Sequence, residues 1–164
     1  MTNIWALLLS TDSLIAGVAL GPLVSARDRW LLAALFGLFD GLGTLLGVTA
    51  VPPSAQVAAD LIPLAIAAYG IYLIGVSMWA RGKVGKPLIY LTPVLLAVDN
   101  LFSGGPDGQA ALTVSDLVAA TVISAALALA GLWFGSFLAS ATGLRPERLA
   151  GAGLLVAAAA VLIT

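Results

Sequence analysis

The chain has 164 residues, of which 61% are hydrophobic and 9% charged, with a net charge of −1. A soluble domain of this size cannot bury so much apolar surface, so the composition excludes a soluble protein and indicates an all-α integral membrane protein. The chain contains no cysteine and no histidine, which excludes disulfides and thiolate or imidazole metal ligands. We expect the protein to lie in a lipid bilayer and to have no nucleic-acid partner.

The apolar runs predict six transmembrane helices, because a spanning helix needs about 20 apolar residues and the loops between the runs are short. The predicted helices cover residues 3–24, 30–51, 60–80, 87–103, 116–139 and 149–164. The first run lacks the basic residues that precede a signal peptide's apolar core, so we expect it to be retained as a helix. Gly21-Pro22 should loosen or end this helix, and Pro93 lies inside the fourth.

The basic residues predict the orientation in the membrane. All seven Lys and Arg residues fall in the loops after the first, third and fifth helices, and the loops after the second and fourth contain none. The positive-inside rule therefore places the basic loops in the cytoplasm. We expect a multi-pass protein of a bacterial inner or plasma membrane, with both termini outside.

The two halves of the chain predict an inverted repeat within a single transmembrane domain. With this orientation, the three helices of residues 1–82 and those of residues 83–164 cross the membrane in opposite directions, a common plan among transporters. Asp12 in the first predicted helix and Asp99 in the fourth are each followed by a polar residue and by a glycine five positions on. The repeat is imperfect, because Asp40 in the second helix has no acidic counterpart in the fifth.

Three acidic residues lie inside predicted spans, namely Asp12, Asp40 and Asp99, and no basic residue does. A carboxylate at bilayer depth costs on the order of 3 kcal/mol unless a proton, a fixed positive group or a bound cation neutralises it. Because no basic side chain lies inside the predicted spans, the group that neutralises these carboxylates must be a proton or a bound cation. The same balance argues against a substrate that carries a carboxylate of its own.

The polar neighbours of these aspartates offer only oxygen and amide groups. The candidate metal site comprises the three aspartates with Thr11, Ser13, Thr44, Asn100 and Ser103. An all-oxygen site suits Mg²⁺, Ca²⁺ or Mn²⁺, whereas copper and zinc prefer imidazole and thiolate ligands. The ligand types do not separate manganese from the other two ions.

A structural interpretation is also open for these residues. Protonated aspartates can cross-link helices by hydrogen bonds, and serine, threonine and asparagine make ordinary interhelical contacts in membranes. The Asp40 side chain could bond to Thr44 one turn away or to another helix. The glycines of the second predicted helix form small-xxx-small patterns that allow another helix to approach closely: Gly37, Gly41, Gly43 and Gly47.

Three motifs carry a resemblance that covers nearly the whole chain: residues 10–13 with the tail to Gly21, residues 36–40 leading to Gly47, and residues 97–100 with Gly104. In them the chain resembles the bacterial manganese efflux pumps of the MntP type, within the lysine-exporter-like transporters. The resemblance implies six helices, essential aspartates at Asp12 and Asp99, and an acidic residue at Asp40, where the family usually has glutamate.

The chain also departs from that family. Serine follows the first aspartate and Asn100 follows the second, where a small residue is usual, and the loop between the third and fourth helices is short and basic. Asn100 could add a ligand, so the metal preference could differ from that of the family.

These observations predict secondary-active export of divalent cations, above all Mn²⁺, by alternating access between the two repeats. Asp12 and Asp99 would bind the ion, with Asp40 as a third ligand or a proton carrier. The sequence has no nucleotide-binding motif, so we expect protons or the membrane potential to drive transport, with no cofactor and no enzymatic activity. The alternatives are an exporter of amino acids or other small cationic metabolites, by fold analogy alone, and a membrane scaffold that transports nothing.

Overall fold

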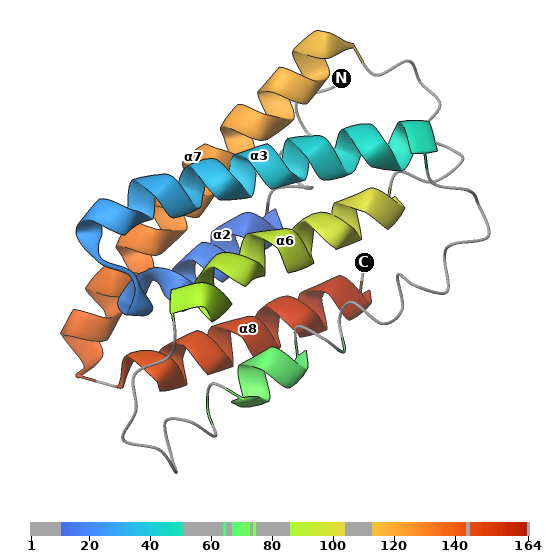
Figure 1. Ribbon diagram of the computed structural model, residues 1–164. Coiled ribbons are helices and arrows are strands. Elements are labelled where there is room, and N and C mark those ends of the chain that lie inside the picture. Colours follow the sequence, from blue (N-terminus) through green and yellow to red (C-terminus); the bar gives the residue numbers. More distant parts are fainter. Residues whose placement is uncertain are drawn as a thin grey trace.

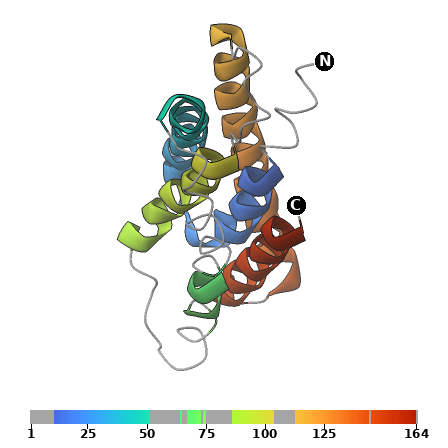
Figure 2. The same ribbon diagram turned by 90° about the vertical axis from the view of Figure 1, so that its right-hand side faces the viewer.

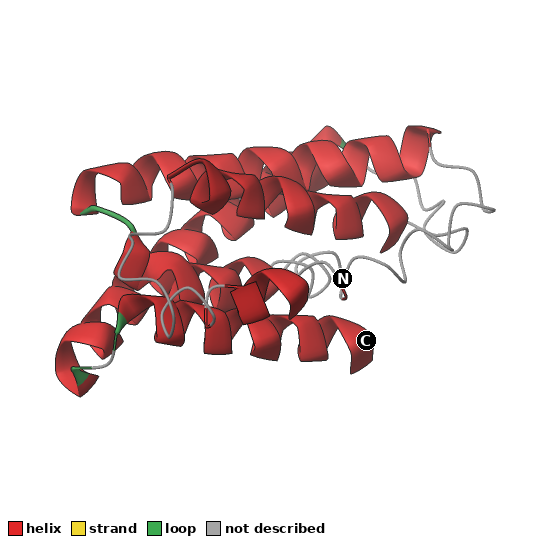
Figure 3. Ribbon diagram, turned by 60° about the horizontal axis from the view of Figure 1, so that its bottom comes forward, coloured by secondary structure: helices red, strands yellow, loops and turns green. Residues whose placement is uncertain are grey.

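The computed structural model describes residues 11–50, 64, 67–72, 74, 86–103, 113–143 and 145–163, with the side chains of the fourth predicted helix described from Ile89 to Val98. All elements in these segments are helical (Figures 1 and 3). They are α2 (Thr11–Leu20), the short 3₁₀ helix η1 (Gly21–Leu23), α3 (Ala26–Ala50), α6 (Lys86–Ser103), α7 (Val114–Thr142) and α8 (Pro146–Ile163). This helical content confirms the all-α part of the fold class that the composition predicts.

The observed helices overlap the predicted runs, with shifted ends. α6 matches its predicted range to within one residue, and α7 and α8 begin two and three residues early. Residues 3–10 of the first predicted helix lie outside the described residues. The third predicted helix is described only in part, and its residues 64, 67–72 and 74 are helical.

Capping residues explain where the longer helices begin. α3 starts four residues before its predicted position because Ser25 caps it, accepting the Asp28 amide at its hydroxyl oxygen at 3.2 Å. Thr113 and Asp116 form a reciprocal capping box at the start of α7. Gly143 ends that helix with a left-handed φ of 65°, a conformation that glycine adopts without steric cost.

The Gly21-Pro22 pair ends α2, as the sequence predicts. The α-helix stops at Leu20, η1 makes one tighter turn, and Val24 is extended with φ −110° and ψ 134°. Proline lacks an amide hydrogen and restricts the residue before it, so the regular helix cannot continue through this point. The chain therefore reverses from α2 into α3 over a few residues, and the two helices remain neighbours of the same partner, α7.

α7 packs against both α2 and α3, which it crosses in Figures 1 and 2. Glycines bring α2 and α7 together: a Cβ atom at Gly17 would lie 2.5 Å from the carbonyl oxygen of Ala128, and one at Gly131 would lie 2.9 Å from the amide nitrogen of Val18. Real side chains do not fit at such distances. The two backbones are therefore in direct contact, the arrangement that small residues allow between membrane helices.

The same helix approaches α3 at the glycines that the sequence singles out. A Cβ atom at Gly37 would lie 2.8 Å from the Cβ of Ala125, and one at Gly41 would collide with the Thr121 hydroxyl. The predicted packing role is thus confirmed for these two glycines. α7 is consequently close enough to both α2 and α3 for short side chains to bridge all three helices.

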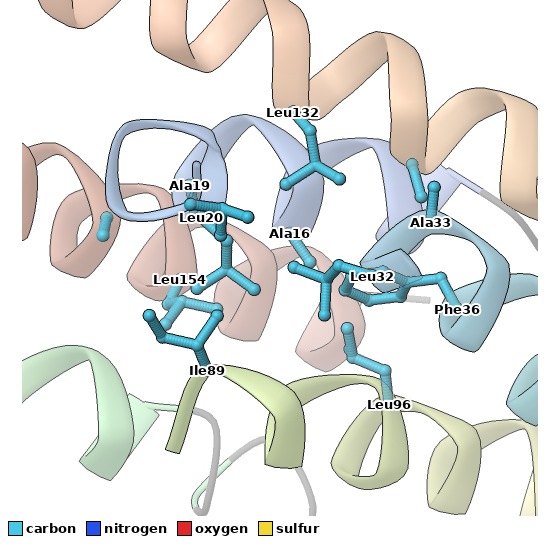
Figure 4. Packing of buried hydrophobic residues seen from close by; sticks show 13 residues of the cluster. Ala16, Ala19, Leu20, Leu32, Ala33, Phe36, Ile89, Leu96, Leu132 and Leu154 are labelled. Atoms are coloured by element: carbon cyan, nitrogen blue, oxygen red, sulfur yellow. The ribbon is translucent and has the colours of Figure 1, made fainter. Parts of the chain in front are cut away.

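The apolar core lies between α2, α3, α6, α7 and α8. Figure 4 shows Ile89 and Leu96 of α6 pointing toward residues of the other helices in this core, among them Leu154 of α8 and Leu32 of α3. Leu32, Leu96 and Leu154 are completely buried. The core therefore fixes α6 against α3.

The outer surface is apolar too. Two described segments are long and apolar enough to cross a membrane, Ala26–Gly47 of α3 and Val114–Thr142 of α7. Large hydrophobic side chains stand exposed on both: Leu38, Leu42, Leu45, Val122, Phe134 and Phe137. An outer surface of this kind is typical of a protein surrounded by lipid.

Candidate functional site

The carboxylate of Asp40 is buried where three helices meet. Asp40 lies in the middle of α3 with 3% of its surface exposed, and its Oδ2 accepts a hydrogen bond of 2.6 Å from the hydroxyl of Ser13 on α2. The hydroxyl of Ser124 on α7 donates to the same oxygen and lies 3.0 Å from the Ser13 hydroxyl oxygen. Both serines are fully buried. We call these three side chains the Asp40 cluster.

Close helix packing creates this cluster. Serine and aspartate side chains are short, so their oxygens meet only if the backbones that carry them nearly touch. Gly17 brings α2 to α7 one turn after Ser13, and Gly131 does so two turns after Ser124. Gly41 brings α3 to α7 beside the cluster. The glycines that look like packing residues in the sequence therefore also determine the geometry of the polar site.

Asp12 joins the cluster through Ser13. The Ser13 amide donates to Asp12 Oδ1 at 2.7 Å, while the Ser13 hydroxyl donates to Asp40. Asp12 is partly buried at the start of the described part of α2. Two of the three aspartates predicted inside the spans are thus connected by a single residue, although Asp12 and Asp40 lie on different helices.

The threonines of the predicted site occupy other positions. Thr44 donates its hydroxyl to the backbone carbonyl of Asp40 at 2.8 Å, so it contacts the residue without reaching the carboxylate. The sequence leaves open whether the Asp40 side chain bonds to Thr44 or to another helix. In the structure it bonds to Ser13 and Ser124 of other helices. Thr11 is exposed at the start of the described chain.

The remaining predicted site residues belong to the C-terminal part of α6: Asp99, Asn100 and Ser103. Their side chains lie outside the described residues. The backbone of α6 is described through Ser103 and packs mainly against α3, with a smaller contact to α2. α6 therefore runs next to both helices that contribute a described aspartate.

Ser124 is a functional candidate that the sequence analysis does not identify. It stands in an alanine-rich helix with no charge in its interior, and a single serine there is an ordinary packing residue. A signal does exist: Ala120, Ser124 and Ala128 form a stripe of small residues at a spacing of four, all buried. A hydroxyl in the middle of such a stripe faces another helix and needs a partner there.

Arg29 corrects the expected distribution of charge. The sequence predicts a polar loop at this position, but α3 already begins at Ala26. Arg29 therefore lies in the first turn of the helix and is only 8% exposed. Its guanidinium donates to Ser136 of α7 at 2.7 Å and lies 4.8 Å from the ring centre of Trp133. A buried basic residue thus exists near a helix end.

This arginine cannot neutralise the Asp40 cluster directly. It precedes Asp40 by eleven positions in one continuous helix, a separation of about 16 Å along the axis. An ion pair requires contact within about 4 Å. The Asp40 carboxylate is therefore stabilised by hydroxyl groups rather than by this cation.

The described part of the site offers oxygen atoms alone. Asp12 and Asp40 supply carboxylates, and Ser13 and Ser124 supply hydroxyls. Among the described side chains, no three His, Cys, Asp or Glu residues lie close enough together to hold a metal ion. The other described oxygens of the site belong to hydroxyl groups. Such donors suit a proton or a hard cation.

No family model, curated protein or solved structure matches the chain. The function has to be inferred from the residues of the chain and their geometry.

Proposed function

We propose that the chain is a secondary-active transporter that exports a divalent cation, with Mn²⁺ as the expected substrate. The observation that carries this proposal is the connection between two carboxylates in an apolar helical protein: Ser13 donates its amide to Asp12 and its hydroxyl to Asp40. Buried acidic groups are costly in such surroundings and are retained mainly where they bind or move an ion.

The donor set favours a cation over an anionic substrate. The two described hydrogen bonds to the Asp40 carboxylate come from neutral hydroxyls, and the buried Arg29 lies about 16 Å away along α3. A proton or a metal ion can balance such a carboxylate. A substrate with its own carboxylate would meet repulsion instead, which weighs against zwitterionic amino acids.

The order of helix contacts supports the inverted repeat that this mechanism needs. In two repeats of three helices, α2 and α6 would correspond, as would α3 and α7. α2 packs against α7, and α6 packs against α3, so the first helix of each proposed half contacts the second helix of the other. α3 and α7 also contact each other. A two-fold axis that relates the two halves would produce this pattern of contacts between corresponding helices.

The proposal assigns Asp12 and Asp99 as the principal metal ligands, each on the first helix of its half. Ser13, Asn100 and Ser103 would add neighbouring oxygens. Asp40 would be a third ligand or a proton carrier, tied to Ser13 and Ser124. The resemblance to manganese efflux pumps of the MntP type supports the same substrate. We also propose that the chain crosses a bacterial inner membrane six times, with both termini outside.

A scaffold without transport activity is the alternative that one observation favours. The Asp40 cluster joins α2, α3 and α7, and a protonated Asp40 could serve only to hold these helices together. In that case, removing the charge at Asp12 would have no effect on any metal response.

Metal-dependent thermal stabilisation of the purified protein separates the two functions. We expect Mn²⁺ to raise the unfolding temperature, because an ion that binds only the folded state stabilises it. Asp12→Asn should abolish this shift. Glu147→Gln, in the first turn of α8 and away from the site, is the matched control and should keep it. If Mn²⁺, Mg²⁺ and Ca²⁺ all leave the wild-type transition unchanged, the protein does not bind the proposed substrate.

A further inference from the structure

Among the described residues, two buried hydroxyl groups have no hydrogen-bond partner. Thr92 of α6 is 2% exposed, and its Oγ1 is buried and unpaired; the hydroxyl of Tyr69, in the helical segment 67–72, is buried and unpaired as well. The two hydroxyls lie beside each other and interact, but together they do not reach the geometry of a hydrogen bond. Buried polar groups in native proteins nearly always have a partner.

The behaviour of Thr92 differs from that of other helical threonines in this chain. Thr44, Thr121 and Thr142 each donate to the backbone carbonyl four residues earlier, which satisfies the hydroxyl within its own helix. Thr92 makes no such bond, so its hydroxyl remains available at the interface between α6 and the segment 67–72. An available hydroxyl there indicates a ligand rather than simple packing.

Pro93 adds a third oxygen at the same level of α6. Proline has no amide hydrogen, so the carbonyl of Ile89 lacks the donor that residue i+4 normally provides. Ile89 is buried, so bulk water does not replace that donor. The Ile89 carbonyl and the Thr92 hydroxyl thus belong to one turn of α6, and the Tyr69 hydroxyl lies beside Thr92 from another segment. All three oxygens are neutral.

We infer that Tyr69, Thr92 and the Ile89 carbonyl form a neutral oxygen station through which the exported cation passes. This inference rests on the proposed function. Asp99 follows Thr92 by seven residues in α6, about 10 Å further along the helix axis. The station is therefore located between Lys86, where α6 begins, and the proposed ligand Asp99.

Neutral oxygens suit a passage site better than carboxylates do. A hard cation that loses part of its water needs replacement oxygens at each step of its path. Conduction also requires that each site hold the ion weakly enough to release it to the next. Hydroxyl and carbonyl groups meet both conditions, and the carboxylate of Asp99 would then receive the ion as the tighter ligand.

The test removes each hydroxyl without changing the shape of the side chain. The full-length protein is reconstituted in liposomes, and Mn²⁺ transport is measured for Tyr69→Phe, Thr92→Val and the double variant. Thr92→Ser keeps a hydroxyl at this position and should therefore transport at the wild-type rate. Tyr72→Phe, at an exposed position of the same helical segment, is the matched control. The unfolding temperature without metal is recorded for each protein.

We expect each single variant to slow transport by about three- to tenfold, the loss of one hydrogen-bond-strength contact to the ion. The unfolding temperature should stay equal or rise, because the deleted hydroxyl has no partner to lose. Wild-type rates in both variants would overturn the inference while the proposed function stood. A lower unfolding temperature would overturn it too, because the hydroxyls would then be structural. A wild-type protein that does not transport Mn²⁺ would instead refute the proposed function and the station with it.

Discussion

Ser13 and Asp40 are 27 residues apart in the sequence, yet the Ser13 hydroxyl donates to the Asp40 carboxylate at 2.6 Å. Ser13 also holds Asp12 through its amide at 2.7 Å. One small residue therefore links Asp12 of α2 to Asp40 of α3. A change in the charge of either aspartate acts on the same residue, which gives the two acidic groups a direct physical means of influencing each other.

The Asp40 cluster should depend on Ser124 as much as on Ser13. We predict that Ser124→Ala lowers the free energy of unfolding by about 0.5–2 kcal/mol, because a buried carboxylate oxygen loses one of its donors. Ser140→Ala on the same helix is the control, since Ser140 is exposed and bonds only to the carbonyl of Phe137. Unfolding of the purified protein in mixed micelles gives the values.

A double-mutant cycle with Ser13→Ala tests whether the serines act as one unit. Residues in one hydrogen-bond network do not contribute additively, so the effects of the two single changes should not add. Additive effects within about 0.3 kcal/mol would show that Ser13 and Ser124 contact Asp40 independently.

The contact between α2 and α7 should not tolerate a side chain at Gly131. A Cβ atom there would collide with the backbone of Leu14 and Val18, and neither backbone can move aside without separating the helices. We predict that Gly131→Ala destabilises the protein by about 1–3 kcal/mol, the usual cost of overpacking. Ala126→Leu, at an exposed position of α7, is the control and should unfold like the wild type. A Gly131→Ala protein of wild-type stability would contradict this close approach.

Much of the fold follows from the order of residue types along the chain. The apolar runs predict α6, α7 and α8 to within a few residues, and Gly21-Pro22 predicts the end of α2. The start of α3 is missed because charged residues suggest a loop, whereas the Ser25 cap allows the helix to include them. Local polarity is a weaker determinant of a helix start than the capping bond.

The site is predictable only in part, for a different reason. Asp12, Asp40 and Ser13 stand out because carboxylates and their polar neighbours are rare in apolar runs. Ser124 does not stand out, since its importance depends on which face of α7 meets α2 and α3. The packing of glycines from separate helices determines which face of α7 meets α2 and α3. The sequence of one helix does not indicate which helix it packs against.

The proposed export requires the charges of Asp12 and Asp99. We predict that Asp12→Asn and Asp99→Asn each abolish manganese export while the protein stays folded in the membrane, because an amide keeps the shape but cannot balance a cation. Asp40→Asn should reduce export less or alter its pH dependence. Manganese tolerance is measured in an exporter-deficient strain with matched protein levels. Wild-type tolerance with Asp12→Asn would remove the central claim of the proposal.

The preference for hard cations should change if a soft ligand enters the site. The chain has no cysteine, and the described side-chain ligand atoms around Asp12 and Asp40 are all oxygen. Thiolate selects zinc and other soft metals, whereas carboxylate and hydroxyl oxygens suit manganese and magnesium. Ser13→Cys places a sulfur next to both aspartates without adding much volume. We therefore predict that this variant gains a Zn²⁺-dependent rise in unfolding temperature and loses part of the rise with Mn²⁺.

The control for that experiment is Ser140→Cys, which adds the same thiol at an exposed position of α7. It should leave the order of metal responses as in the wild type, because its sulfur has no carboxylate partner in the site. Cells that carry each variant are then challenged with manganese and with zinc, and their metal contents are compared. If Ser13→Cys and Ser140→Cys respond alike to zinc, Ser13 does not face the ion, and the metal ligands must be sought among other residues.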